Sequence, residues 1–451
     1  MMTLLISVCI AAFLALLWLP RRNQVSLGLP IAYLYLLLLI HVPGAFAHVV
    51  GGDFLVNTDL IQIAMRFVAI GAVCFVLGVW WARRRSVPIV PISGNLDRKG
   101  FCLFCLIVGW VSSFGLSPLY SIPSVSAAVL QGGAVWMLGV LLGLRTAVHN
   151  RDFRWIGFWL AALAVYPTAI LLIGGFLSYG AAAVVLVFSV FAVSVRKYWQ
   201  ALGGVVLFVF LSMSVFVTYY QHRNEIRDQV WNGAPMDARI DSVMRAVNDF
   251  QFLDPTNRDH LYALDARLNQ NYFAGLAARR IEQGRVSYLE GESVWEGLEA
   301  LVPRAFWPDK PVFAGSPQIV SKMTGLRFRW DTSIGVGNVM EFQINFGTPG
   351  VVVGFLLLGW LIGTLDVRAA MAERRGELGK VILYFLPCVA LIQPNGSLVE
   401  LFSGSAAALV GASVWYWAWK RFIGRKSSQK WMPLRSANRI EGPAYKHQSA
   451  S

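Results

Sequence analysis

Residues 60–82 read LIQIAMRFVAIGAVCFVLGVWWA, and the arginines at 83–85 follow at once. A stretch of about 20 mostly apolar residues is long enough to cross the hydrocarbon core of a bilayer as a helix. Arginines directly after such a stretch are typical of its cytoplasmic end. The segment therefore predicts a transmembrane helix that ends on the cytoplasmic side.

Similar apolar stretches recur along the whole chain. Of its 451 residues, 56% are hydrophobic and 14% are charged, and the mean hydropathy is +0.55. This composition is too apolar for a soluble protein of the same length. We expect an all-α polytopic integral membrane protein with about eleven spans, at 2–20, 27–48, 60–82, 100–118, 124–144, 155–175, 179–195, 201–219, 349–367, 381–394 and 398–419.

The basic residues set the expected orientation. Basic residues cluster after spans one, three, five, seven and nine, before span four, and in the C-terminal tail. Because successive spans cross the bilayer in opposite directions, all these clusters fall on the same side. Short cytoplasmic loops carry such an excess. The C-terminus is therefore expected in the cytoplasm and, with an odd number of spans, the N-terminus outside. The net charge of +14 is then a result of topology, and we expect no nucleic-acid partner.

The same reading divides the chain into four parts. We expect an N-terminal bundle of about eight spans at 1–218, a large external loop at 219–348, about three spans at 349–420, and a basic cytoplasmic tail at 421–451. The loop carries 14 basic and 16 acidic residues. Because it is the one long polar segment, we expect the function to lie there.

The loop itself is expected to be helical. Charged and apolar residues at helical spacing over 219–270, for example at 239–250, predict an amphipathic helix, which residues 254–257 break. Further helices are expected at 268–282 and at 294–302, the latter ending at Pro303. A last helix from 335 should carry Glu341, facing the outer solvent or a cavity, and lead into the next span after a turn at 347–350.

The polar residues of the loop limit its chemistry. The sequence has no zinc-site motif, no nucleophile elbow and no phosphate-binding glycine loop with its lysine. Arginine suits phosphate, because its planar guanidinium group can donate to two oxygens at once. An acid or base must come from Glu341, Asp309, Asp331 or His260.

Two motifs carry a resemblance to a known family. Tyr288, then Gly291-Glu-Ser293, then an apolar helix, then VPRAFWPDKP at 302–311, resembles oligosaccharide repeat-unit polymerases of the O-antigen polymerase (Wzy) kind. The later EFQINFGTPG at 341–350 is similar to the segment that enters the span after the large loop of that family. The number of spans and the single dominant loop are similar too.

The resemblance implies a metal-independent, GT-C-like membrane glycosyltransferase without a cofactor. It would act at the periplasmic face of the bacterial inner membrane, moving a glycan from undecaprenyl pyrophosphate to a sugar hydroxyl of the next lipid-linked repeat unit. Membrane lipids and a chain-length regulator would be partners. On this interpretation Glu341 is the leading base, with Asp309 and His260 as further acid-base candidates, and the pyrophosphate is held by Arg223, Arg279, Arg280, Arg304, Lys310 and Arg327.

Two alternatives stay open. The related O-antigen ligases carry a His-Asn pair just before the helix into the following span, whereas Gly337-Asn338 stands here without a histidine. This difference favours a polymerase. A transporter of lipid-linked glycans would be expected to show inverted repeats and broken helices near the midplane, and the sequence has no visible repeat.

Overall fold

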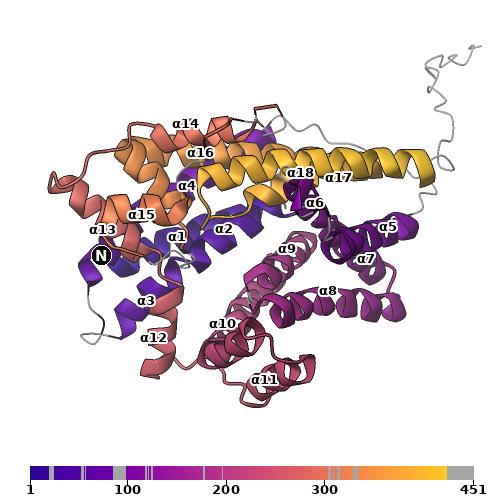
Figure 1. Cartoon of the computed structure of the whole chain (residues 1–451), viewed down its shortest axis with the longest axis horizontal. Coiled ribbons are helices and arrows are strands. Elements are labelled where there is room, and N and C mark those ends of the chain that lie inside the picture. The colour runs from indigo at the N-terminus through magenta and orange to yellow at the C-terminus, as the bar shows by residue number, and fades with distance from the viewer. Residues whose placement is uncertain are drawn as a thin grey trace, which may run out of the picture.

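The computed structural model describes most of the chain, and within the described part every regular element is a helix (Figure 1). The described residues are 1–19, 25–51, 55, 57–84, 98–116, 119, 121–122, 125–175, 178–195, 197–302, 306–307, 309–311, 315–328 and 334–423. The helices are α1 (Met2–Trp18), α2 (Leu29–Leu39), α3 (Val42–Val50), α4 (Thr58–Arg84), α5 (Arg98–Trp110), η3 (Val111–Gly115), α6 (Val125–Gly133), α7 (Val135–His149), α8 (Phe153–Gly174), α9 (Ser178–Ser194), α10 (Tyr198–Trp231), α11 (Met236–Asn248), α12 (Arg258–Arg267), α13 (Asn271–Glu282), α14 (Glu292–Ala300), α15 (Ser316–Thr324), α16 (Asn338–Arg374), α17 (Leu378–Leu391), α18 (Leu398–Ala418) and η5 (Trp419–Ile423).

Eight helical segments of the described part are long and apolar enough to cross a bilayer. They are α2 with α3, α4, α5 with η3, α6 with α7, α8, α10, α16, and α18 with the residues after it. This architecture agrees with the prediction of an all-helical, multi-pass membrane protein. The other three expected spans coincide with α1, α9 and α17, which are shorter apolar helices. The count of eleven therefore stays a prediction.

Two expected spans are broken helices. The span at 27–48 divides into α2 and α3 at His41, where Pro43 follows as one of the first residues of α3. Proline starts a helix well but cannot continue one, because it lacks an N–H group. The span at 124–144 divides at Ala134, after Gly132 and Gly133.

Helix α10 is longer than expected. It continues to Trp231, although the apolar stretch was expected to end at 219. A helix satisfies its own backbone hydrogen bonds in hydrocarbon and in water alike, so the change to polar side chains does not end it. The helix ends only at Asn232 and Gly233, where Gly233 has a φ of +71°.

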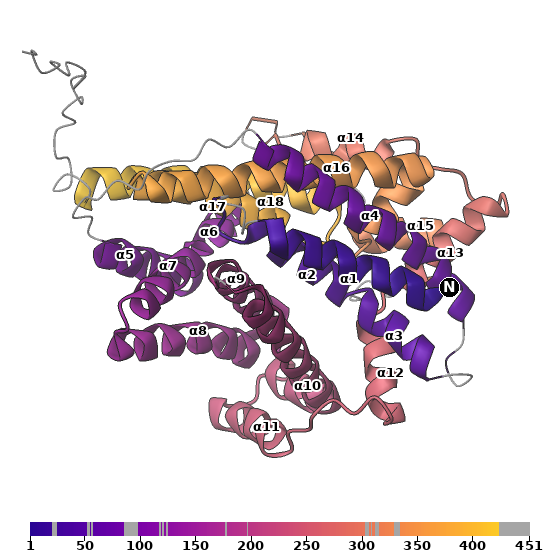
Figure 2. The same ribbon diagram turned by 180° about the vertical axis from the view of Figure 1, so that it is seen from behind.

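Helix α16 is the central element, and α4 lies along it (Figure 2). The two backbones approach closely at glycines. A Cβ on Gly78 would lie 2.2 Å from the carbonyl oxygen of Leu356, and a Cβ on Gly359 would lie 2.2 Å from that of Phe75. Gly359 and Gly363 are four residues apart on α16, the spacing that lets transmembrane helices pack closely.

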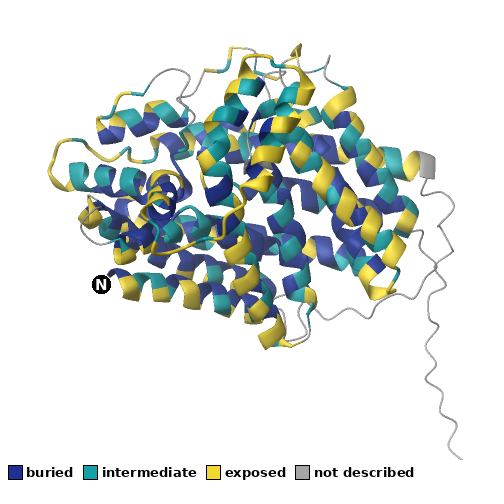
Figure 3. Ribbon diagram, turned by 90° about the horizontal axis from the view of Figure 1, so that it is seen from below, coloured by how far each residue is buried: buried dark blue, intermediate teal, exposed yellow. Residues whose placement is uncertain are grey.

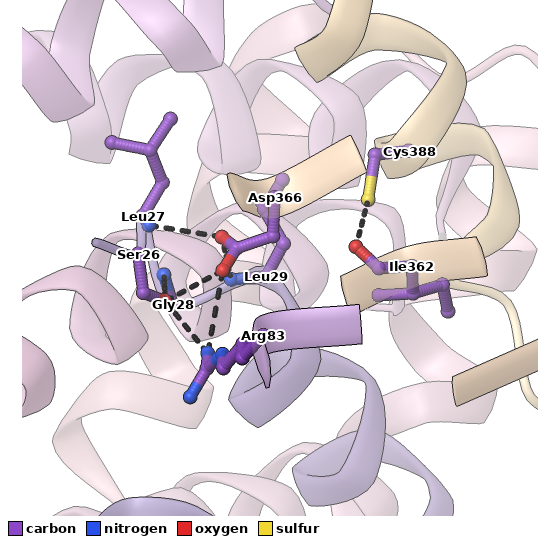
Figure 4. Close-up of polar contacts among 8 residues, drawn as sticks. All are labelled: Ser26, Leu27, Gly28, Leu29, Arg83, Ile362, Asp366 and Cys388. Atoms are coloured by element: carbon purple, nitrogen blue, oxygen red, sulfur yellow. Dashed lines mark hydrogen bonds and ion pairs between the residues drawn. The ribbon is translucent and has the colours of Figure 1, made fainter. Parts of the chain in front are cut away.

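A fully buried ion pair fixes one end of this helix pair (Figure 4). Asp366 on α16 accepts from the backbone N–H groups of Leu27 at 2.9 Å and Leu29 at 3.3 Å, and from the Ser26 hydroxyl at 2.6 Å. Arg83 on α4 donates at 3.3 Å to Oδ2 of this carboxylate, the oxygen that also accepts from Ser26. One carboxylate thus joins α4, α16 and the segment before α2.

A second acidic residue holds the same end of α16 to two more helices. Glu373 is buried and accepts from Arg98 on α5 at 3.4 Å and from Arg145 on α7 at 3.1 Å. The charged groups of these two clusters therefore make structural contacts. In sequence they were visible only as part of the orientation signal.

At the opposite end of the bundle, α13, α14 and α15 pack on the first turns of α16 (Figure 1). The expected helices at 268–282 and 294–302 correspond to α13 and α14, and the one at 239–250 to α11. Helices α12 and α15 were not expected. Helix α16 is kinked at Phe346 and Gly347, which confirms the turn expected at 347–350.

The buried residues follow this packing (Figure 3). One large apolar cluster fills the bundle, with Phe75, Phe355 and Phe385 among its fully buried side chains. A smaller cluster joins α13 and α15 to the start of α16. Because this second cluster is continuous with α16, the outer helices are placed firmly over the first residues of α16.

Candidate functional site

Glu341 lies at the centre of the contacts made by the first turns of α16. Its side chain is fully buried. One carboxylate oxygen, Oε2, accepts from the backbone N–H of Leu398 at 2.7 Å, at the start of α18. The other, Oε1, has no hydrogen-bond partner among the described residues. We expected Glu341 to face the outer solvent or a cavity; the first option is wrong, because α14 and α18 cover it.

An unpartnered buried carboxylate oxygen is unusual. Burying a charged or polar group without a hydrogen bond costs free energy, so such groups in folded proteins are often explained by function, by strain or by water. The geometry therefore marks Oε1 of Glu341 as the atom of this site with unused hydrogen-bonding capacity.

Two polar side chains connect Glu341 to α14. Asn345, one turn further along α16, donates to the Ser293 hydroxyl at 2.8 Å and to the backbone oxygen of Glu341 at 2.7 Å. Its own carbonyl oxygen accepts from the N–H of Gly291 at 3.1 Å. The Ser293 hydroxyl also lies beside the Glu341 carboxyl group. Helix α14 is thus held over the carboxyl group by a small polar network.

The turn between α17 and α18 is fixed against the beginning of α16. Asn338 donates through its backbone N–H to Pro394 and through its side chain to Gly396, and accepts from the Tyr33 hydroxyl at 2.8 Å. Ser397 and Glu400 form a capping box at the start of α18. The N–H group that Glu341 accepts from is therefore held in place on both sides.

Arg280 and Arg327 belong to the same outer cluster of helices. The buried Nε of Arg280, on α13, has no hydrogen-bond partner among the described residues. Its guanidinium group lies against Gly325, where a Cβ would come within 2.7 Å of it. Gly325 ends α15 with a φ of +73°, and the exposed Arg327 follows two residues later. Both arginines thus lie near the turn that ends α15.

No family model, no curated protein and no solved structure matches this chain. The site is therefore interpreted from its own residues and their contacts. Fully buried Glu341 and the cations of α13 and of the turn after α15 are the features that matter most.

Arg279 and Lys310, both expected to bind pyrophosphate, have partners within the protein. Arg279 forms an ion pair with Asp59 at the start of α4. The Nζ group of Lys310 donates to the carbonyl oxygens of Ala300 at 3.1 Å and Val302 at 2.9 Å. Cations near a helix C-terminus stabilise its free carbonyl groups, so Lys310 holds the end of α14.

Arg223 lies in a separate place. It lines an open groove between α10 and α12, with a cavity of about 520 Å³ and with Tyr220, Asn224 and Tyr262 among its other lining residues. Figures 1 and 2 both place α12 and α14 at opposite edges of the molecule. The structure therefore does not bring Arg223 together with Glu341.

Both ring nitrogens of His260 have hydrogen-bond partners within the protein. The residue is buried, its Nδ1 accepts from the backbone N–H of Asp254 at 3.1 Å, and its Nε2 lies 3.0 Å from the side-chain oxygen of Gln251. Both ring nitrogens thus hold the segment before α12. This leaves neither nitrogen free for a substrate in this conformation.

Replacing His260 with alanine is expected to lower stability without changing the activity of the folded protein. It would leave the backbone N–H of Asp254 without its acceptor, at a cost of about 1–3 kcal/mol, whereas the Gln251 oxygen would keep its bond from Gln221. A thermal unfolding midpoint in detergent would measure the loss. The exposed His149 gives the matched control, His149→Ala, which should leave the midpoint unchanged. Equal midpoints for both variants would contradict the structural role.

The remaining predicted site residues add nothing to the described geometry of the site. Asp309 is exposed, and Arg304 and Asp331 lie outside the residues that the structure describes. Two histidines were missed, His41 and His48, because both fall within the expected span at 27–48. His41 lies 2.8 Å from Asn271, and His48 lies 2.8 Å from Asp265. A histidine inside an apolar stretch was the only signal that could have found them.

Proposed function

We propose that this chain is a membrane glycosyltransferase that polymerises lipid-linked oligosaccharide repeat units. It acts at the periplasmic face of a bacterial inner membrane, with its N-terminus in the periplasm and its C-terminus in the cytoplasm. The observation that carries the proposal is the buried carboxyl group of Glu341, with one oxygen unpartnered, on α16, the helix on which α13, the helix of Arg280, packs. The resemblance of residues 287–311 and 335–350 to repeat-unit polymerases supports it.

The proposed reaction needs one base and one set of cations. The acceptor sugar hydroxyl attacks the anomeric carbon of the donor glycan, and its proton passes to Oε1 of Glu341. The bond between that carbon and the phosphate oxygen breaks, and undecaprenyl pyrophosphate leaves. Arg280 and Arg327 stabilise the charge that develops on the pyrophosphate, because guanidinium groups bind phosphate oxygens in pairs.

Access to Glu341 requires α14 to move. The carboxyl group is enclosed, and α14 is held by the contacts of Asn345 to Ser293 and Gly291 and by an ion pair of Glu292 with Lys322 at 2.9 Å. The ion pair is exposed on both sides, so it contributes little stability. Displacing α14 therefore breaks the two hydrogen bonds of Asn345 and the packing of α14 on α18, where Gly297 lies against Leu398 and Phe402.

The test is to express the chain in a host that lacks its own repeat-unit polymerase and makes a matching repeat unit. The wild type should restore a ladder of glycan lengths on a gel. Arg280→Ala should lower the polymerisation rate about 10- to 150-fold, which corresponds to a lost charged hydrogen bond of about 1.5–3 kcal/mol. Glu341→Gln should lower it about 100-fold or more, as expected for a general base.

Arg285→Ala is the matched control. Arg285 is exposed and follows Arg280 by five residues, so its replacement should leave the ladder intact. All variants must be present in the membrane in equal amounts. No ladder with the wild type, together with transfer of a preformed polymer to lipid A core, would indicate a ligase. Movement of lipid-linked units across the membrane without polymerisation would indicate a transporter. Either result would overturn the proposal.

A further inference from the structure

Helix α11 exposes an apolar side although it lies outside the main bundle. Met236, Ile240, Met244 and Val247 succeed one another at intervals of four, four and three residues, which places them on one side of the helix. They are 50, 43, 49 and 58% exposed. A soluble loop helix would turn such a side towards the protein, so this orientation needs another explanation.

A different side of α11 faces the protein. Ser242 and Ala246 are the buried residues of the helix. Arg239 fixes the rotation of the helix, because it donates to the backbone oxygens of Ala234 at 2.8 Å and Leu172 at 3.2 Å. Arg245 forms an ion pair with Glu225 of α10. The apolar side is therefore held away from the protein by specific contacts.

The third side of α11 is polar. Asp237, Asp241, Arg245 and Asn248 lie next to the apolar side on the helix circumference and are exposed. A helix with an apolar side, a polar side and a protein side is suited to the boundary between hydrocarbon and water.

The segment that follows α11 runs back along α10 into its apolar part. The backbone N–H and carbonyl of Gln251 both bond to the hydroxyl group of Thr218, and the N–H of Leu253 donates to Ser214 at 3.0 Å. Ser214 is one helical turn before Thr218, so the chain descends along α10. Non-helical backbone is tolerated at membrane depth only where the protein satisfies its polar groups, and these two hydroxyl groups satisfy three of them, the N–H and carbonyl of Gln251 and the N–H of Leu253.

The exposed apolar surface is continuous from α10 to the end of this segment. Val206, Leu207 and Phe210 of α10 are exposed, as expected for a side that faces lipid. Phe252 stacks on Phe210 with ring centroids 5.8 Å apart, and Phe250 contacts Phe252 edge to face at 5.2 Å. Both phenylalanines are themselves exposed. The apolar side of α11 and these rings thus extend the lipid-facing surface of the bundle.

We propose that α11 lies in the membrane interface on the loop side of the bilayer, with the side chains of Met236, Ile240, Met244 and Val247 among the lipid acyl chains. Its acidic and basic residues point towards water and lipid headgroups. The partner of this surface is phospholipid, since the surface is continuous with the lipid-facing side of α10. The inference does not depend on the proposed glycosyl transfer.

Spin labels on single introduced cysteines test the position of α11. We would label full-length Met244→Cys and Asp241→Cys variants and reconstitute them into vesicles of phosphatidylcholine and phosphatidylglycerol. For each label we would measure how often it collides with oxygen, which enters the hydrocarbon, and with a nickel chelate, which stays in water. The five native cysteines are buried, and wild-type protein treated with the same label controls for their reaction. The label at 244 should meet oxygen preferentially, with a ratio of oxygen to nickel collisions several-fold higher than at 241.

Equal ratios at 244 and 241 would overturn the proposal, because both sides of the helix would then lie in the same environment. A label at 244 that neither reagent reaches would overturn it as well, since a protein partner would then cover the surface. Ile240→Cys lies one turn away on the same side and should repeat the result of Met244→Cys. This second position covers the case in which one variant does not fold.

Discussion

Replacing Asp366 with alanine is expected to lower the free energy of unfolding by about 3–5 kcal/mol, because one partner of a buried ion pair is lost. Arg83 would remain as a charge in a fully buried place. The N–H groups of Leu27 and Leu29, which donate to this carboxylate, would also lose their acceptor. Each of these groups lies away from water, so solvent cannot replace the carboxylate.

The loss can be measured as a shift of the thermal unfolding midpoint of the purified protein in detergent. Glu292→Ala is the control, because the pair of Glu292 with Lys322 is exposed and contributes about 0–1 kcal/mol. A double variant, Arg83→Met with Asp366→Leu, should recover part of the stability, since it removes both charges together. An Asp366→Ala protein as stable as the Glu292→Ala protein would contradict the assigned role.

Replacing Gly359 with valine is expected to prevent α4 and α16 from packing. The first carbon of the new side chain would lie 2.2 Å from the carbonyl oxygen of Phe75, and a backbone atom cannot rotate away as a side chain can. Overpacking of a core costs about 1–3 kcal/mol and occasionally more. Because this clash is with a helix backbone at the central helix pair, we expect a value at or above the upper end of that range.

Gly204→Val on α10 is the matched control, because a Cβ there would meet no atom within 4 Å. Valine also has a higher helix propensity than glycine, so this variant should be as stable as the wild type. The fraction of protein that elutes as a single folded species after heating measures both variants. Equal fractions for Gly359→Val and Gly204→Val would show that the two helices are not as close as described.

The spans were the part of the fold that the sequence predicted best. Apolar length is a local property of the chain, and each expected span coincides with a helix or a pair of helices. The breaks at His41 and Ala134 were missed, because a hydropathy pattern does not show whether a residue such as Pro43 or Gly133 interrupts the helix. Helices α12 and α15 were missed because they are short and most of their stability comes from packing on other helices.

The site could be predicted only in part. Glu341 was recognised as the best candidate for a base, but its burial under α14 depends on contacts between residues more than 50 positions apart in sequence. The basic residues looked equivalent in sequence. Their roles differ in the structure, since Arg279 and Lys310 have protein partners whereas Arg223 lines a different groove.

The ion pair of Arg83 and Asp366 has a consequence for the order of events during synthesis. The two residues are 283 positions apart. At a synthesis rate of about 5–20 residues per second, Asp366 is made roughly 15–60 s after Arg83. During this time α4 and the segment from Ser26 to Leu29 lack the carboxylate that joins them. The junction of α4 with the segment before α2 is therefore completed late, once α16 has been made.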